Sequence, residues 1–167
     1  MKLLGTIAAI SMPLPVLASL AQAQAEPVKF EALVAQKEAI RLDFADASKR
    51  FFLLVRREGK TEGQGPLAGA KVQEYGAHDV VPGVGGEPHG YLEFAASDGS
   101  KAYLKWTIQA VFVPGPDGKP KLLDNGVWHV VGATGSWEKL KGAGTFRLRF
   151  PAPTDRRFVM EGELGQH

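Results

Sequence analysis

The sequence predicts an all-β protein formed by one domain of antiparallel strands, and three observations support this class. Its 167 residues include 20 Gly, 11 Pro, 3 Trp, 3 Tyr and 9 Phe, a composition that favours turns and strands. Short runs alternate apolar and polar residues with a period of two, as half-buried strands do. No amphipathic helical pattern lies between these runs to indicate a parallel sheet.

The N-terminus is predicted to be a secretory signal peptide covering residues 1–25. Lys2 precedes an apolar run that ends at Leu20, and the next residues alternate Ala and Gln, which places small residues at the cleavage positions. We expect cleavage after Ala25 or Ala23 and a periplasmic or secreted protein. An uncleaved membrane anchor is the alternative, but the run is short for a span and two prolines interrupt it. No membrane partner is expected after cleavage.

Cysteine content and charge exclude several kinds of function. The sequence has no Cys, which excludes a disulfide framework, a thiol nucleophile and a thiolate metal site. Twenty Lys plus Arg against 18 Asp plus Glu give a formal net charge of +2. This charge is too close to neutral for a protein that binds nucleic acid by neutralising many phosphates. We therefore expect no nucleic-acid partner.

Residues 26–38 form an N-terminal segment whose structure the sequence leaves open. Phe30, Leu33 and Val34 fit a helical spacing, and the Ala, Glu, Gln and Lys residues around them have high helix propensity. A short helix and an extended arm both satisfy this pattern. The β domain is expected to cover residues 39–167.

Two strands are predicted next. Ile40, Leu42 and Phe44 alternate with polar residues, and a β-rich run at residues 51–57 follows a turn-like segment. The period of two from residue 39 onward is typical of a sheet and not of a helix.

The most regular alternation lies in residues 101–113, where one face is apolar and the other polar. Only an odd-length loop to the preceding strand keeps the apolar side chains of both strands on the same face. A three-residue loop pairs Phe94 with Leu104 and Leu92 with Trp106.

A second hairpin joins the last two strands. Centring its loop on Thr154 pairs Leu148 with Met160 on one face and Arg147 with Glu161 on the other. Apolar and charged residues thus favour the same register.

Further strands are predicted at residues 70–81 and 122–131, with Asn125 and Gly126 forming a turn or a bulge in the second of them. The total is about eight short strands separated by turn signals, which is typical of a sandwich or a closed barrel.

A family resemblance favours the barrel. Residues 132–146 resemble the Gly-x-Thr-Gly-x-aromatic turn and the following strand of the allene oxide cyclase and dirigent barrels. Residues 126–131 fit the strand that leads into this turn, and residues 158–164 are similar to the closing strand. The resemblance implies a small exported member with a calycin-like, eight-stranded antiparallel barrel and a short N-terminal arm or helix. It also implies an interior cavity, but no catalytic residue transfers with it.

The candidate catalytic residues are Glu74, Tyr75 and His78. On a strand, Glu74 and His78 share one face, so they can converge inside a barrel as a base and its orienting partner. An exposed or hydrogen-bonded edge is the alternative. The spacing of His78, His89 and His129 and the carboxylates near them matches no zinc motif, and no Ser lies in a Gly-x-Ser-x-Gly turn. We predict neither a metal site nor a cofactor.

The leading functional interpretation is a non-catalytic exported barrel that binds a small apolar ligand in its interior. The apolar faces of successive strands predict the lining: Leu92, Phe94, Leu104, Trp106, Ile108, Phe146, Leu148 and Met160.

Two alternatives belong to other classes. One is a cyclase or isomerase type of enzyme that confines an apolar substrate beside Glu74, His78 or Tyr75. The other is a homo-oligomeric structural or interaction protein, which needs a contiguous apolar outer patch. The candidate patch residues are Val111, Val113, Phe52 and Leu54.

Overall fold

The computed structural model describes residues 24–166, which form nine strands and one short 3-10 turn. The strands are β1 (Glu26–Asp43), β2 (Phe51–Gly63), β3 (Lys71–Val81), β4 (Gly85–Gly86), β5 (His89–Ala95), β6 (Lys101–Pro114), β7 (Pro120–Ala133), β8 (Leu140–Arg149) and β9 (Arg156–Gln166), and the turn η1 covers Gly135–Trp137. Apart from its last two residues, the predicted signal peptide lies outside the described residues. No helix within residues 24–166 is long and apolar enough to cross a membrane.

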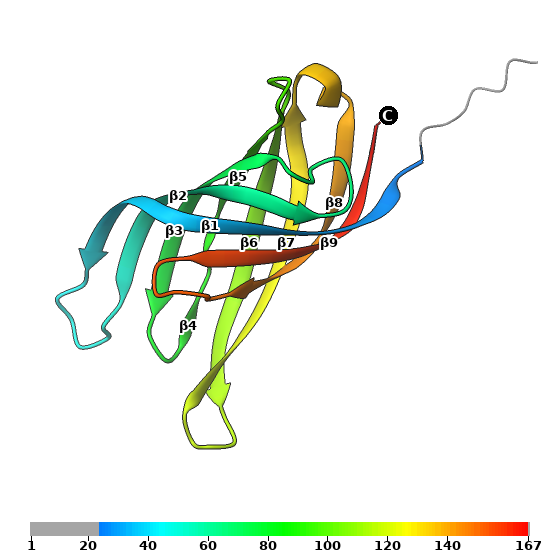
Figure 1. Cartoon of the computed structure of the whole chain (residues 1–167). Coiled ribbons are helices and arrows are strands. Elements are labelled where there is room, and N and C mark those ends of the chain that lie inside the picture. The colour runs from blue at the N-terminus through cyan, green and yellow to red at the C-terminus, as the bar shows by residue number, and fades with distance from the viewer. Residues whose placement is uncertain (1–23, 167) are drawn as a thin grey trace, which may run out of the picture.

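Eight of the strands close into an antiparallel barrel (Figure 1). Their order around the ring is β2, β1, β9, β8, β7, β6, β5 and β3, and β3 pairs with β2 to close it. The two-residue β4 bridges β3 and β6 at one end. The predicted all-β, eight-stranded antiparallel barrel is confirmed.

The segment 26–38 is neither a helix nor an arm outside the barrel. It is the first part of β1, which pairs with β9 from Glu26 to Val34 and with β2 from Phe30 onward. Phe30, Ala32 and Val34 alternate into the interior and are buried. Pairing on both edges outweighs the helix propensity of these residues, so the predicted domain boundary at residue 39 is corrected and the barrel includes residues 26–38.

The first hairpin keeps the predicted faces but differs in register by two residues. Leu92 lies opposite Leu104, and Phe94 lies opposite Ala102. The loop is centred on Asp98, one residue earlier than predicted. The Asp98 carboxylate accepts a hydrogen bond from the backbone N–H of Ser100 at 2.9 Å and so fixes the position of the turn.

The C-terminal hairpin shows the same two-residue difference. Leu148 lies opposite Phe158, and Arg147 lies opposite Val159 and not Glu161. The register places Gly144 opposite Gly162, and a Cβ on either glycine would lie 2.8 Å from Cζ2 of Trp128. Facing glycines therefore make room for the indole ring of Trp128.

Asn125 and Gly126 form neither a turn nor a bulge. They lie in the regular part of β7, opposite Gln109 and Ile108. The absence of a side chain on Gly126 makes room for the ring of Phe146, whose Cε1 would lie 2.2 Å from a Cβ at this position. The glycine is thus required by packing between β7 and β8.

Candidate functional site

A charged pair lies inside the barrel on β2 and β3. Nη1 of Arg57 donates hydrogen bonds to Oε1 of Glu74 at 2.9 Å and to Oε2 at 2.8 Å. Arg57 is 1% exposed and Glu74 is 0% exposed. Nε of Arg57 donates to the carbonyl oxygen of Thr154 at 2.9 Å, so the pair is also tied to the β8–β9 loop.

His78 approaches this pair on the same face of β3. Its Nε2 lies 3.6 Å from Oε1 of Glu74, and Gly76 lies between the two residues in sequence. A Cβ on Gly76 would lie 2.7 Å from Oε1 of Glu74 and 2.8 Å from Nε2 of His78. The glycine therefore gives the two side chains the space in which they meet, and the structure brings Glu74 and His78 together inside the barrel.

Two buried nitrogen atoms near this pair have no hydrogen-bond partner among residues 24–166: Nε2 of His78 and Nε1 of Trp106. The ring centroids of the two residues are 6.0 Å apart. Buried polar atoms nearly always have a partner, so each unpaired atom in a native structure calls for an explanation, such as a bound ligand or water.

Tyr75 lies apart from the other two candidates. It is 46% exposed on the outer face, where its hydroxyl donates to Oε1 of Gln73 at 2.6 Å. Successive residues of a strand point to opposite faces, so Tyr75 cannot join Glu74 and His78.

Two further histidines lie on the outside. His89 and His129 are both exposed. In the part of the chain that the structure describes, no three His, Asp or Glu side chains form a group that could hold a metal ion.

The predicted ligand-lining residues all face the interior, and they are between 0% and 7% exposed: Leu92, Phe94, Leu104, Trp106, Ile108, Phe146, Leu148 and Met160. They belong to one apolar cluster. Within it, the ring of Trp106 packs edge-on against Phe146 and Phe158, with centroid separations of 6.0 Å and 5.6 Å. These residues therefore form the packed core.

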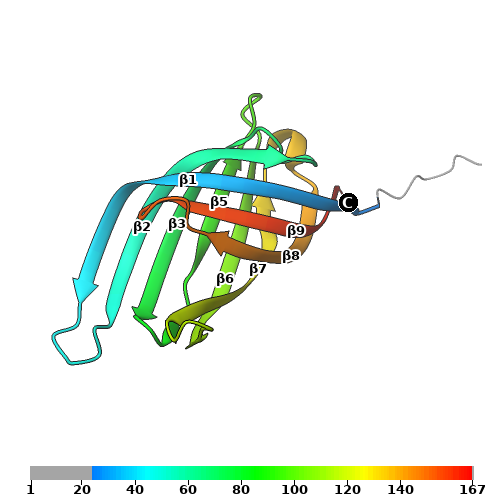
Figure 2. The same ribbon diagram turned by 60° about the horizontal axis from the view of Figure 1, so that its bottom comes forward.

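The side chains that face the interior become more exposed toward one end of the barrel, which we call the mouth. It is defined by the half-buried apolar residues Phe51, Leu53, Val80, Phe112 and Leu122, at the ends of β2, β3, β6 and β7. Every second residue of a strand faces the interior, so these five residues lie on the same inner face as buried Val55, His78 and Ile108. Figure 2 shows the ends of β1, β2 and β3 projecting past β8 and β9 on this side.

Asp124 is a buried carboxylate close to the mouth. Backbone pairing between β7 and β8 covers only Gly126–His129 against Ala143–Phe146. Beyond it, Oδ2 of Asp124 accepts the backbone N–H of Leu148 at 2.6 Å. The Asp124 side chain thus replaces the backbone hydrogen bonds at the point where β7 separates from β8.

Arg156 is half-buried at the start of β9. Its pKa is lowered to about 10, first because burial disfavours the charged form and then because the charge of Arg57 is close. Its Nη1 donates to the carbonyl oxygens of Asp155 at 2.7 Å and Pro153 at 3.2 Å, and its guanidinium lies 4.7 Å from the ring centroid of Phe150. It forms no ion pair with a carboxylate of residues 24–166.

Arg57 is not among the site residues predicted from the sequence, although the sequence contains a signal for it. Phe51, Leu53 and Val55 alternate on one face of β2, and continuing the same period of two places Arg57 in the interior. A charged residue at the inward position of an apolar strand is a signal for a buried polar site.

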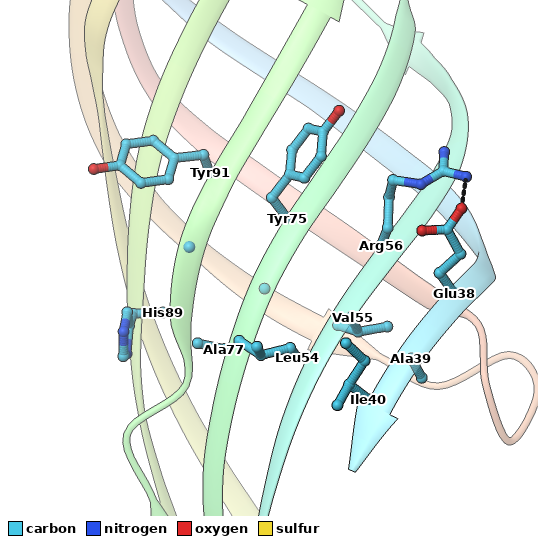
Figure 3. A pocket seen from close by; sticks show the side chains of 12 residues that line it. Glu38, Ala39, Ile40, Leu54, Val55, Arg56, Tyr75, Ala77, His89 and Tyr91 are labelled. Atoms are coloured by element: carbon cyan, nitrogen blue, oxygen red, sulfur yellow. Dashed lines mark hydrogen bonds and ion pairs between the residues drawn. The ribbon is translucent and has the colours of Figure 1, made fainter.

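A separate hollow lies on the outer face of β1, β2, β3 and β5 (Figure 3). This outer groove is open to solvent and has a volume of about 470 Å³. Ile40, Leu54 and Ala77 lie along one side of it, and the rings of Tyr75 and Tyr91 lie along the other. Of the predicted outer-patch residues, it includes Leu54.

Comparison with known proteins supports the fold. The sequence matches no protein-family model, and no curated protein matches it. The solved structure of a protein of unknown function from Clostridium acetobutylicum has a TM-score of 0.56 and 12% identity, covering 87% of this chain and 99% of that chain. A β-barrel-like protein from Acinetobacter baumannii has a TM-score of 0.51 and 13% identity, with coverages of 87% and 99%. At such identities the likeness shows a shared fold alone.

A dirigent protein is also among the structural neighbours. The pterocarpan synthase dirigent protein has a TM-score of 0.48 and 12% identity, covering 95% of this chain and 98% of that chain. The structural neighbours thus include a protein of unknown function, a β-barrel-like protein and a dirigent protein.

Proposed function

We propose that the protein binds a small, mostly apolar molecule carrying one polar group, and that this molecule enters through the mouth. The observation that carries the proposal is the buried Arg57–Glu74 pair with His78 beside it in an otherwise apolar interior. Replacing a buried ion pair by apolar residues is often neutral or stabilising, so stability alone does not account for the pair. Charged residues at strand positions where the pattern calls for apolar ones are expected at functional sites.

The mouth and the charged pair supply the two parts of such a site. Half-buried apolar side chains at the mouth, Leu53 and Val80 among them, suit the apolar body of the ligand. Nε2 of His78 and Nε1 of Trp106 are buried atoms able to bind its polar group. The ligand therefore lies nearer the mouth than the sequence analysis expected, with Trp106 and Ile108 as its floor.

Fluorescence of N-phenyl-1-naphthylamine, an apolar probe that brightens in apolar surroundings, tests the proposal. Leu53→Trp fills the mouth, while Leu54→Trp places the same ring on the outer face, where Leu54 is exposed. We expect saturable binding that Leu53→Trp weakens at least about tenfold and that Leu54→Trp leaves unchanged. Absence of saturable binding, or loss only in Leu54→Trp, would refute the proposal.

Native mass spectrometry of protein purified from its own host then tests for a natural ligand. A stoichiometric adduct that Leu53→Trp removes is the expected result, and extraction after denaturation gives its chemical class. A homogeneous protein without an adduct counts against the proposal.

A second candidate is an enzyme that isomerises or cyclises a confined apolar substrate, and the convergence of Glu74 and His78 favours it. The Glu74 carboxylate already accepts two hydrogen bonds from Arg57, so His78 is the side chain free to move a proton. This candidate requires that the extracted ligand changes chemically with wild-type protein but not with His78→Asn. If neither the wild-type protein nor His78→Asn changes the ligand, the protein binds it without catalysis.

We also propose that the chain is exported, on the basis of its N-terminal sequence. N-terminal sequencing of the protein from a periplasmic fraction should begin at Glu26 or Gln24. Recovery of an intact Met1 terminus would count against export.

A further inference from the structure

The end of β1 has one open edge. Its ladder with β9 stops at Val34 opposite Arg156, whereas its ladder with β2 continues to Asp43 opposite Phe51. All residues from 37 to 50 are exposed, and this end projects from the body of the barrel (Figure 1). An open strand edge presents backbone N–H and C=O groups that are ready to pair with another strand.

A bulge at Lys37 gives this edge an apolar outer face. Gln36 lies opposite Arg57 and Glu38 lies opposite Arg56, which leaves Lys37 as the extra residue. Before the bulge the even-numbered residues face the interior; after it they face outward. Ile40 and Leu42 are therefore 74% and 59% exposed.

The hydrogen-bond pattern shows which backbone groups face the open edge. The backbone N–H of Phe44 donates to the carbonyl oxygen of Arg50 at 3.0 Å. In an antiparallel ladder such pairs recur at every second residue, so Leu42 and Ile40 also bond toward β2. Ala39, Arg41 and Asp43 then direct their N–H and C=O groups to the open edge.

We propose that two copies of this chain pair through this edge, with β1 antiparallel to β1 and a two-fold axis at Ile40. In this register Ala39 lies opposite Arg41 of the partner subunit, and both residues have outward backbone groups that can exchange hydrogen bonds. Ile40 lies opposite Ile40 of the partner subunit, which brings two exposed apolar side chains together. A two-fold axis makes every contact occur twice.

Charge complementarity favours this register over its two neighbours and favours a second copy as the occupant. The axis at Ile40 places Lys37 opposite Asp43 of the partner subunit, twice in the dimer. Moving the axis to Ala39 places Lys37 opposite Arg41 of the partner subunit, and moving it to Arg41 places that residue opposite its own copy. Like charges directly opposite each other are destabilising, so both of these shifted registers are disfavoured. Asp43 already pairs with Arg41 of its own strand at 2.6 Å, and Lys37 of the partner subunit would add a second cation to this exposed carboxylate.

The dimer would also extend the apolar outer face. Ile40 lies opposite Leu54, and both residues line the outer groove. Pairing at Ile40 joins the two grooves edge to edge in one continuous sheet. This interface adjoins the mouth, because Asp43 lies opposite Phe51 and the guanidinium of Arg41 lies over the Phe51 ring. The two proposals are tested by different variants, since Leu53→Trp addresses probe binding and the charge exchange addresses the dimer.

Sedimentation equilibrium of the purified protein tests the proposal through a charge-exchange cycle. We expect a wild-type dimer, a rise in its dissociation constant of at least about tenfold for either Lys37→Glu or Asp43→Lys, and recovery in the double variant. Lys49→Glu reverses an exposed charge in the adjacent loop and should leave the dimer unchanged.

Ala39→Pro adds a test of the backbone. It removes an N–H that faces the open edge and leaves the ladder to β2 intact, so the fold should persist by circular dichroism while the dimer weakens. A monomeric wild-type protein would overturn the proposal. So would a dimer that is indifferent to Ala39→Pro and to the charge cycle, because its interface would then lie elsewhere.

Discussion

Nε2 of His78 lies 3.6 Å from Oε1 of Glu74, on the same inner face of β3. The distance depends on the residue between them, because Gly76 has no side chain to fill the gap. It also depends on Arg57, which fixes the carboxylate from the neighbouring strand. The polar part of the interior is thus arranged by two adjacent strands.

Removing the charge of Glu74 should destabilise the barrel strongly. Glu74→Gln leaves Arg57 as a buried charge without a compensating carboxylate, and we expect a loss of about 3–5 kcal/mol in the free energy of unfolding. Urea denaturation measures it. The exposed pair Lys29–Glu161 provides the control, since Glu161→Gln should cost far less than Glu74→Gln. Equal losses in the two variants would contradict the burial argument.

A methyl group at position 76 should separate Glu74 from His78. Gly76→Ala forces one or both side chains to move, and we expect a destabilisation of about 1–3 kcal/mol together with a shifted His78 ring signal by NMR. Gly132→Ala is the matched control, because the nearest atom to its Cβ would be Cδ2 of Tyr103 at 3.7 Å. A neutral Gly76→Ala would show that the approach of the two side chains is loose.

The turn at Asp98 should lose its contribution to stability in acid. The backbone N–H and hydroxyl of Ser100 and the hydroxyl of Ser136 donate to this carboxylate and lower its pKa. The ionised Asp98 carboxylate stabilises the folded protein fully above its pKa in the unfolded chain, which is about 4. This stabilisation is lost as the pH falls through the lower pKa of Asp98 in the folded protein. Thermal melting of Asp98→Asn should therefore lie below wild type at pH 7, and the gap should close in acid; a constant gap would contradict this.

Asp124 should hold β8 against β7 at the mouth. Asp124→Ala leaves the backbone N–H of Leu148 without its acceptor, and we expect a loss of about 1–3 kcal/mol. Hydrogen exchange identifies the cause, because protection of the Leu148 amide should fall more than that of Phe146. Uniform loss of protection would instead indicate a general weakening of the barrel.

Periodicity predicted the faces of the strands but not their registers. A shift of two residues keeps every side chain on its face, so apolar patterns cannot distinguish such registers. In one hairpin the choice depends on the turn that Asp98 forms with Ser100. In the other it depends on Gly144 and Gly162 facing each other beneath Trp128, a contact with a third strand.

The candidate site was predictable only in part. The spacing of Glu74 and His78 placed both residues on one face of a strand, and the structure brings them together.

The bulge at Lys37 left no signal in the composition, so the period of two read across it does not show that Ile40 faces solvent. At the end of β1, therefore, apolar alternation identifies the strand but not its buried face.

Ring closure by β1 and β9 joins segments from opposite ends of the chain, with Glu26 opposite Leu164. The barrel cannot be completed until its last strand has been synthesised, and such distant pairings slow folding. Until then, the edges of β1 and β8 stay available to other chains. Because the two ends meet in one ladder, a short linker between them would permit new termini in a hairpin loop, and a permuted chain of this kind would complete the ring by a local hairpin.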